Sequence, residues 1–162
     1  LSLYRDPEAE LARYDAAAAR RKVALLCASD AHGWPTYGAA FDAFSMHVPV
    51  ATTGDAAVDV PRVRAALRDG SAWCVLDAVA PAWGVRLELA PSRDRLDLRV
   101  ATAGGGRRSY HLYRDGAPVG TMATASDGAS FSCGGPCPAG AWRVEGRRDG
   151  EAWLFTNPLW IE

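Results

Sequence analysis

Residues 141–161 read AWRVEGRRDGEAWLFTNPLWI, and apolar and polar side chains alternate there on both sides of Asp149-Gly150. Alternation with a period of two predicts strands that bury one face. Asp-Gly between two such runs is a strong short-range signal for a β-hairpin. The stretch therefore predicts two antiparallel strands joined by a tight turn.

The same pattern extends back to about residue 83. The runs WGVRLELA (83–90), DRLDLRVA (94–101) and SYHLYRDGAPVGTMA (109–123) also alternate, and the last of them contains a second Asp-Gly step. Gly, Asp and Pro separate the runs, and no helical period follows residue 70. We therefore expect residues 83–162 to form an antiparallel, immunoglobulin-like β-sandwich.

The first eighty residues show a different pattern. PEAELARYDAAAARRK (7–22) predicts an amphipathic helix, and PRVRAALRDG (61–70) predicts a second one that begins at its proline and stops at its glycine. VALLCA (23–28) is apolar throughout, as in strands that are covered on both faces, and SAWCVLDAV (71–79) predicts another strand. We expect residues 1–80 to be an α/β segment.

Charge and hydropathy exclude two classes of partner. Eighteen Lys and Arg residues stand against nineteen Asp and Glu, so the net charge is −1 and the composition shows no electrostatic footprint for nucleic acid. No apolar run approaches the roughly 20 residues that a membrane-spanning helix needs. We therefore expect neither a nucleic-acid nor a membrane partner, and the compartment, cytoplasmic or exported, stays open.

The four cysteines fall into two kinds of context. Cys27 and Cys74 lie in apolar, strand-like runs, where a free cysteine acts as a small hydrophobic residue. Cys133 and Cys137 flank Gly-Gly-Pro in a turn-rich stretch, where a local disulfide and two free thiols are both open readings. Two cysteines are too few for a structural zinc site, which takes four ligands.

Residues 29–34, SDAHGW, suggest a functional site. They directly follow VALLCA, and in parallel α/β folds the loops after the strands carry the active site. Asp30 and His32 offer a carboxylate and an imidazole two residues apart, a pair that suits a divalent metal. In the alternative reading, Asp30 caps a turn and His32 is an ordinary surface residue.

Three phrases together resemble a known family. SDAHG, the ALRDG helix ending and the terminal FTNPLWIE resemble the C-terminal half of PHP-domain (polymerase and histidinol phosphatase) metal-dependent phosphoesterases, in the CehA/McbA-like metallohydrolase branch. The resemblance implies the last part of a (β/α)7 barrel followed by the sandwich. It also implies a cluster of divalent metal ions, with zinc, manganese or iron as candidates, and Asp30 and His32 as two of the ligands.

The chain departs from the family in its other ligands. The family's opening H-x-H has no counterpart among the three histidines, so we expect the missing ligands in residues upstream of Leu1. The resemblance then implies a phosphoesterase-like hydrolase of small phosphorylated or ester substrates, of which this chain is a part that is incomplete alone. One alternative is a non-catalytic sandwich module for binding or assembly on an α/β scaffold. Another is a structural, exported sandwich with a Cys133–Cys137 bridge.

Overall fold

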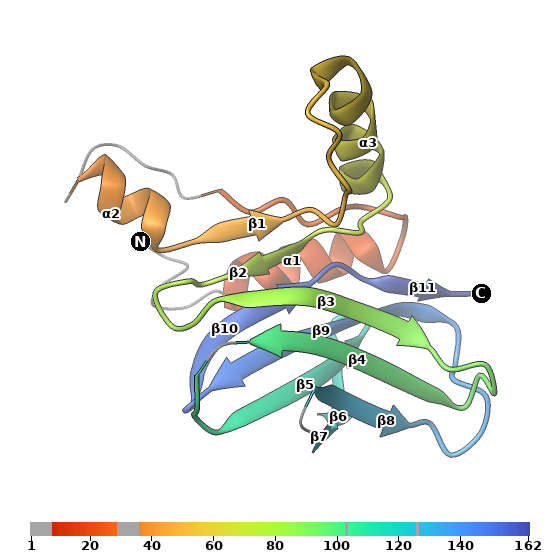
Figure 1. Cartoon of the computed structure of the whole chain (residues 1–162). Coiled ribbons are helices and arrows are strands. Elements are labelled where there is room, and N and C mark those ends of the chain that lie inside the picture. The colour runs from red at the N-terminus through yellow and green to blue at the C-terminus, as the bar shows by residue number, and fades with distance from the viewer. Residues whose placement is uncertain (1–7, 29–35, 103, 126) are drawn as a thin grey trace.

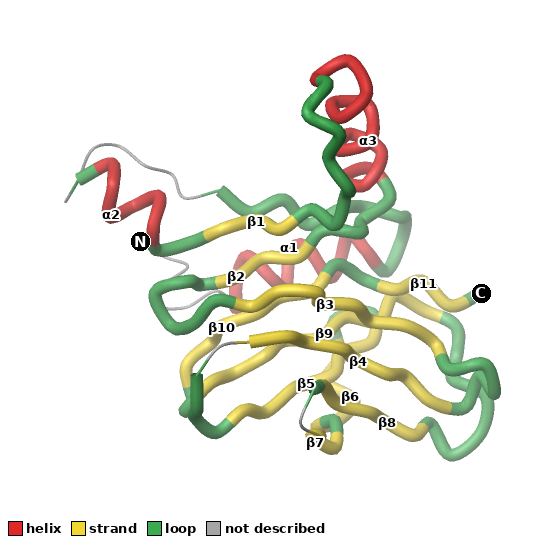
Figure 2. The backbone as a smooth tube through the Cα atoms, viewed as in Figure 1, coloured by secondary structure: helices red, strands yellow, loops and turns green. Residues whose placement is uncertain are grey.

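The computed structural model describes residues 8–28, 36–102, 104–125 and 127–162, which form two antiparallel sheets and three helices (Figures 1 and 2). The helices are α1 (Glu8–Ala18), α2 (Tyr37–Asp42) and α3 (Ala56–Arg68). The strands are β1 (Ser45–His47), β2 (Trp73–Val75), β3 (Ala82–Leu89), β4 (Arg95–Thr102), β5 (Arg108–Arg114), β6 (Ala117–Thr121), β7 (Ala123–Ala125), β8 (Gly128–Ser132), β9 (Gly140–Arg148), β10 (Glu151–Thr156) and β11 (Leu159–Ile161).

Every strand pair is antiparallel. The larger sheet, sheet A, has the order β1-β2-β10-β9-β5-β6, and β11 pairs with the beginning of β9. The smaller sheet, sheet B, has the order β3-β4-β8-β7. Sheet A thus contains two strands from before residue 80, because β2 pairs with β1 on one side and with β10 on the other.

The two hairpins expected at Asp-Gly steps are confirmed. Asp115 and Gly116 join β5 to β6, and Asp149 and Gly150 join β9 to β10. All four residues have a positive φ, between 51° and 95°, which is the backbone that two-residue hairpin turns require. Because these turns are encoded by adjacent residues, the sequence alone was enough to locate them.

The core lies between the two sheets. Trp142, Val144 and Trp153 of sheet A pack against Leu96 and Leu98 of sheet B, and all five are buried. Tyr110, Leu112, Val75 and Val100 extend the same cluster. The alternating pattern of residues 83–161 therefore places one apolar row from each sheet into a shared interior.

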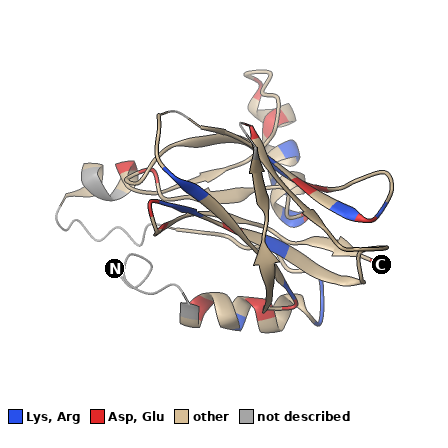
Figure 3. Ribbon diagram, turned by 90° about the horizontal axis from the view of Figure 1, so that it is seen from below, with Lys and Arg blue, Asp and Glu red and all other residues tan. Residues whose placement is uncertain are grey.

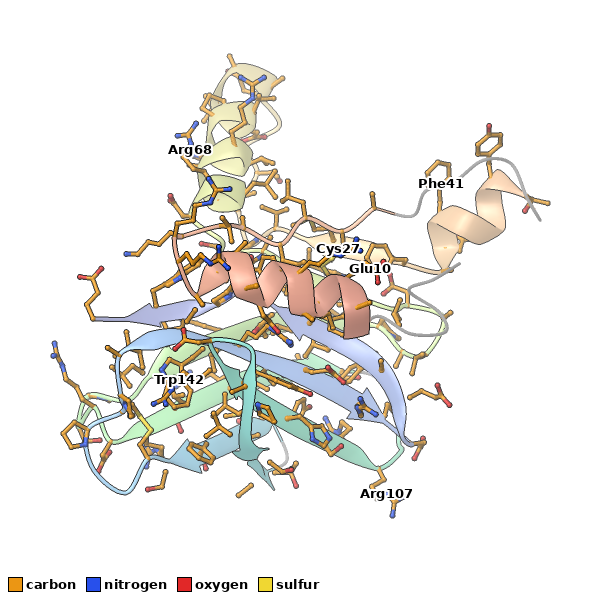
Figure 4. The ribbon with its side chains drawn as sticks, turned by 180° about the vertical axis from the view of Figure 1, so that it is seen from behind. Glu10, Cys27, Phe41, Arg68, Arg107 and Trp142 are labelled. Carbon is orange, nitrogen blue, oxygen red and sulfur yellow. A yellow bond between two sulfur atoms is a disulfide. The ribbon has the colours of Figure 1, made fainter. Side chains whose placement is uncertain are left out.

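Helix α1 covers the other face of sheet A (Figures 1 and 4). Leu11 of α1 packs with Phe44, Leu76 and Phe155 in a second, smaller cluster. A buried ion pair joins the same two layers, since Arg143 of β9 contacts both carboxylate oxygens of Asp15 at 2.6 Å. The Arg143 guanidinium also lies 4.3 Å from the centre of the Tyr113 ring.

The expectation of a (β/α)7 barrel fragment is wrong. Such a barrel needs parallel strands flanked by helices, whereas β1 and β2 are short, antiparallel and continuous with sheet A. Within the described residues, segment 23–28 forms no strand. Its apolar side chains carried the sequence signal, but a strand also needs a neighbour that pairs with its backbone. The described part of the chain is mostly β.

Helix α3 begins five residues before the predicted Pro61. Asp55 caps it by accepting a hydrogen bond from Ala57 N at 2.8 Å, and the Asp59 carboxylate accepts bonds from Thr53 N and Gly54 N. The bond from Thr53 N holds the pKa of Asp59 below its usual value. These acceptors stabilise the start of the helix, which continues through the internal proline.

Charges are interspersed over the strands, as Figure 3 shows, which agrees with the near-zero net charge. Among the described helices, none is long and apolar enough to cross a membrane.

Candidate functional site

The predicted metal ligands Asp30 and His32 lie outside the described residues, in the interval 29–35. The flanking segments are described: 23–28 on one side, and Thr36 with α2 on the other.

Segment 23–28 is held by a side chain rather than by a strand. The Asn157 amide, between β10 and β11, accepts a hydrogen bond from Leu25 N at 2.5 Å and donates one to Leu25 O at 3.2 Å. It donates a further bond to Ala72 O at 2.8 Å. Asn157 thus bonds both backbone groups of Leu25, as a neighbouring strand would, and it links the segment to the residue before β2.

Tyr14 of α1 strengthens the same attachment. Its hydroxyl lies 3.1 Å from Val23 O and 3.3 Å from Asn157 Oδ1 and donates toward both oxygens. Burial raises the pKa of the Tyr14 hydroxyl well above its usual range, although the nearby Arg143 opposes that shift. The hydroxyl therefore stays protonated, as a donor, throughout the neutral pH range.

A disulfide forms the second attachment. Cys27 is bonded to Cys74 of β2, with 6.1 Å between their Cα atoms, so the reading of these two residues as free hydrophobic cysteines is wrong. Cys74 is fully buried, and both cysteines pack with Leu11 of α1 in the smaller core cluster (Figure 4). The bond fixes the residue that lies three positions before Asp30.

Cys133 and Cys137 form the other disulfide in the structure, with Cα atoms 5.2 Å apart. The loop between them packs on the β3–β4 turn, because Cys137 N donates to Arg93 O at 2.7 Å and Cys133 N donates to Asp94 O at 2.8 Å. This bridge lies at an end of the sandwich and takes no part in holding segment 23–28.

The outer sides of the two flanks are apolar and exposed. Leu26 is 62% exposed, and on α2 the side chains of Tyr37 and Phe41 are 58% and 63% exposed. The two rings of α2 stack with centroids 6.3 Å apart. Large apolar side chains are thus exposed to water on both segments that adjoin this short interval, and such side chains favour contact with another surface.

His47 is the described histidine in the N-terminal half of the chain. Its Nε2 lies 2.8 Å from Ser45 Oγ, and its ring stacks on Trp73 with centroids 5.4 Å apart. His111 on β5 likewise lies 3.1 Å from Ser109 Oγ. Within residues 8–28, 36–102, 104–125 and 127–162, no three His, Cys, Asp or Glu side chains gather where they could hold a metal ion.

Sequence reasoning singled out the TNP phrase but missed what its asparagine does. It also missed the Cys27–Cys74 bond. Both contacts join segments far apart in the chain, 132 residues apart for Asn157 and Leu25 and 47 for the disulfide, so periodicity carries no signal of them.

No family model, no curated protein and no solved structure matches the chain.

Proposed function

We propose that this chain is the C-terminal part of a metal-dependent hydrolase of the phosphoesterase kind, to which it contributes Asp30 and His32 as metal ligands. The observation that carries the proposal is the double attachment of the segment before Asp30. Asn157 holds Leu25 and Cys74 holds Cys27, so the chain enters SDAHG from a fixed base. Metal ligands need such support, because small displacements weaken coordination.

The donor pair fits a divalent cation. A carboxylate oxygen and an imidazole nitrogen are ligands that zinc, manganese and iron accept. A bound ion of this kind lowers the pKa of its water and polarises a phosphoryl or acyl oxygen, which is the chemistry that hydrolysis of a phosphoester or a related ester needs. Asp30 and His32 would orient the ion from one side.

Two ligands leave most of a metal's coordination sphere to other groups, so a partner must supply the rest. We propose the N-terminal part of the same protein as this partner. The exposed side chains of Leu26, Tyr37 and Phe41 support the proposal, because they give a second surface an apolar contact on both flanks of the ligand pair.

The test measures metal content and turnover in the protein together with its natural upstream residues. Asp30→Ala and His32→Ala should each lower bound metal, measured by mass spectrometry of the purified protein, and should reduce hydrolysis of p-nitrophenyl phosphate at least tenfold. Asp127→Ala and His111→Ala, the same substitutions at an aspartate and a histidine of the sandwich, are the controls and should change neither quantity. Unchanged metal content in both ligand variants would remove Asp30 and His32 from the site.

The chain of residues 1–162 alone should bind divalent metal weakly and turn over negligibly, because two ligands leave the ion mostly hydrated. Turnover of p-nitrophenyl phosphate by this chain that disappears in Asp30→Ala would contradict that expectation.

A non-catalytic module for binding or assembly is the second candidate. The exposed side chains of Leu26, Tyr37 and Phe41 favour it equally, since an assembly surface needs apolar contacts and no metal. The two candidates separate in the same experiment, because a module of this kind would hold no metal that depends on Asp30 or His32.

A further inference from the structure

A groove of about 730 Å³ opens where the C-terminal end of α3, the strand β3 and the last strand β11 come together. Ala72, Trp73, Thr156 and Asn157, all buried residues, lie at its base. The walls come from the turn after α3, the middle of β3 and residues 158–160, together with Lys22 and Pro49. All of these lie within the described residues.

The base of the groove is fixed by hydrogen bonds. Asn157 Nδ2 donates to Ala72 O at 2.8 Å, and Thr156 Oγ1 accepts from Val144 N at 2.9 Å. The turn after α3 is seated closely on this base, since a Cβ added to Gly70 would lie 3.5 Å from the Trp160 ring and 3.6 Å from Asn157. The positive φ of Gly70, 68°, also favours glycine there. The groove is therefore preformed.

Three cations stand around the groove. Lys22, Arg68 and Arg86 line it, against the single carboxylate of Asp69. Arg68 occupies the last turn of α3, at the end of the helix nearer the sheets (Figures 1 and 4). The backbone carbonyls of Ala65, Ala66 and Leu67 accept hydrogen bonds from the three residues after Arg68, so the helix end does not present them as free acceptors.

Two of these cations already pair with carboxylates of the chain, but these ion pairs compete only weakly with an incoming anion. Lys22 pairs with Glu162 at 3.0 Å, and Arg86 pairs with Glu88 at 3.1 Å, which Arg99 also contacts at 3.3 Å. The Lys22, Glu162 and Arg86 side chains are mostly in water, and exposed pairs of this kind contribute little. An incoming anion can therefore take the place of either carboxylate.

Between the cations the lining is part apolar and part polar. Trp73, Val85, Leu87, Leu159 and Trp160 line the space together with Ser71, Thr156 and Asn157. A small-molecule site combines apolar surface with a few well-placed polar groups. Here the cations supply the charge, and Leu159 and Trp160, both partly exposed, offer apolar surface to a ring.

We infer that this groove is a binding site for a small organic anion, with its apolar ring against Leu159 and Trp160 and its anionic group at Arg68 and Arg86. The inference is independent of Asp30 and His32 and of the proposed hydrolase activity. An inorganic anion lacks the ring and a neutral ring lacks the charge, so each should bind more weakly than a molecule that has both.

The test uses 2-naphthalenesulfonate, which contains no phosphoester and so cannot be consumed by the proposed activity. Its matched probes are naphthalene-2-sulfonamide, which has the ring without the charge, and inorganic sulfate, which has the charge without the ring. Isothermal titration calorimetry of the 162-residue chain should give a dissociation constant for the sulfonate at least tenfold lower than that for either probe. In ¹⁵N NMR spectra the Gly70 amide and the Trp73 and Trp160 indole signals should shift.

The double variant Arg68→Gln/Arg86→Gln should weaken sulfonate binding at least tenfold and leave sulfonamide binding unchanged. Arg107→Gln is the control, since this exposed arginine lies at the opposite end of the molecule (Figure 4). The inference is overturned if the sulfonate does not bind, if sulfonate and sulfonamide bind equally, if the double variant binds as the parent does, or if the shifts avoid Gly70, Trp73 and Trp160.

Discussion

At the scale of single residues, Asn157 joins three separate parts of the chain: α1, segment 23–28 and the residue before β2. One amide bonds both backbone groups of Leu25 and the carbonyl of Ala72, and it receives the Tyr14 hydroxyl as well. Asn157 is itself a buried residue, so these bonds are largely shielded from water.

Asn157→Ala should therefore destabilise the chain by about 3 kcal/mol, because it leaves three backbone groups without their partner and each buried loss costs roughly 1 kcal/mol or more. Urea unfolding followed by circular dichroism measures this. Tyr14→Phe is the matched comparison, since it removes only a hydroxyl from the same cluster, and it should cost about 1 kcal/mol. Equal stability of Asn157→Ala and the parent chain would mean that segment 23–28 does not depend on the amide.

At this scale, contacts could be predicted from the sequence only where the residues that make them are close together in the chain. The turns at Asp115-Gly116 and Asp149-Gly150 were predictable, because adjacent residues set the backbone of a hairpin turn. The pairing of Cys27 with Cys74 was not, since 47 residues separate them and their apolar surroundings suit a free cysteine equally well.

At the scale of elements, the strands after residue 82 were the most predictable part. Six of them, β3, β4, β5, β8, β9 and β10, have one face in the core between the sheets, and such a strand shows its burial as alternation. Segment 23–28, by contrast, was wrongly predicted to be a strand, because its run does not alternate. Its continuous apolar run suggested a strand covered on both faces, whereas in the structure one side meets α1 and β2 and Leu26 is exposed.

The two disulfides should differ in what they contribute at this scale. Constraint of the unfolded chain grows with the loop that a bond closes. The separation of 47 residues between Cys27 and Cys74 corresponds to about 4 kcal/mol, and the separation of 4 between Cys133 and Cys137 corresponds to about 2 kcal/mol. We therefore expect Cys27→Ala/Cys74→Ala to lower the free energy of unfolding about twice as much as Cys133→Ala/Cys137→Ala.

Chemical denaturation of both double variants measures this difference, and thiol titration of the unfolded parent chain confirms that its four cysteines are oxidised. A larger loss from the Cys133–Cys137 variant would contradict the ranking. It would show that the bridge at the β3–β4 turn, rather than the attachment of segment 23–28, limits stability.

At the scale of the whole molecule, the first eighty residues and the rest share one sheet. β2 pairs with β10 over Trp73–Val75, and the core between the sheets contains Trp73 and Val75 beside Trp153. Residues 80–82, which connect the two parts, also accept hydrogen bonds from core tryptophans. The indole of Trp153 donates to Ala80 O at 2.5 Å and that of Trp73 donates to Ala82 O at 3.5 Å. A division of the chain near residue 80 would cut through these contacts.

The chain should consequently unfold in a single cooperative transition. Tryptophan fluorescence reports mainly on the core, and far-ultraviolet circular dichroism reports on strands and helices together, so the two should give the same midpoint. A chain that begins at Trp83 should show a lower midpoint or no cooperative transition, because it exposes the β10 edge that β2 covers and removes Trp73 and Val75 from the core. Two separate transitions in the full chain, with the later one reproduced by residues 83–162 alone, would instead make the sandwich an independent folding unit.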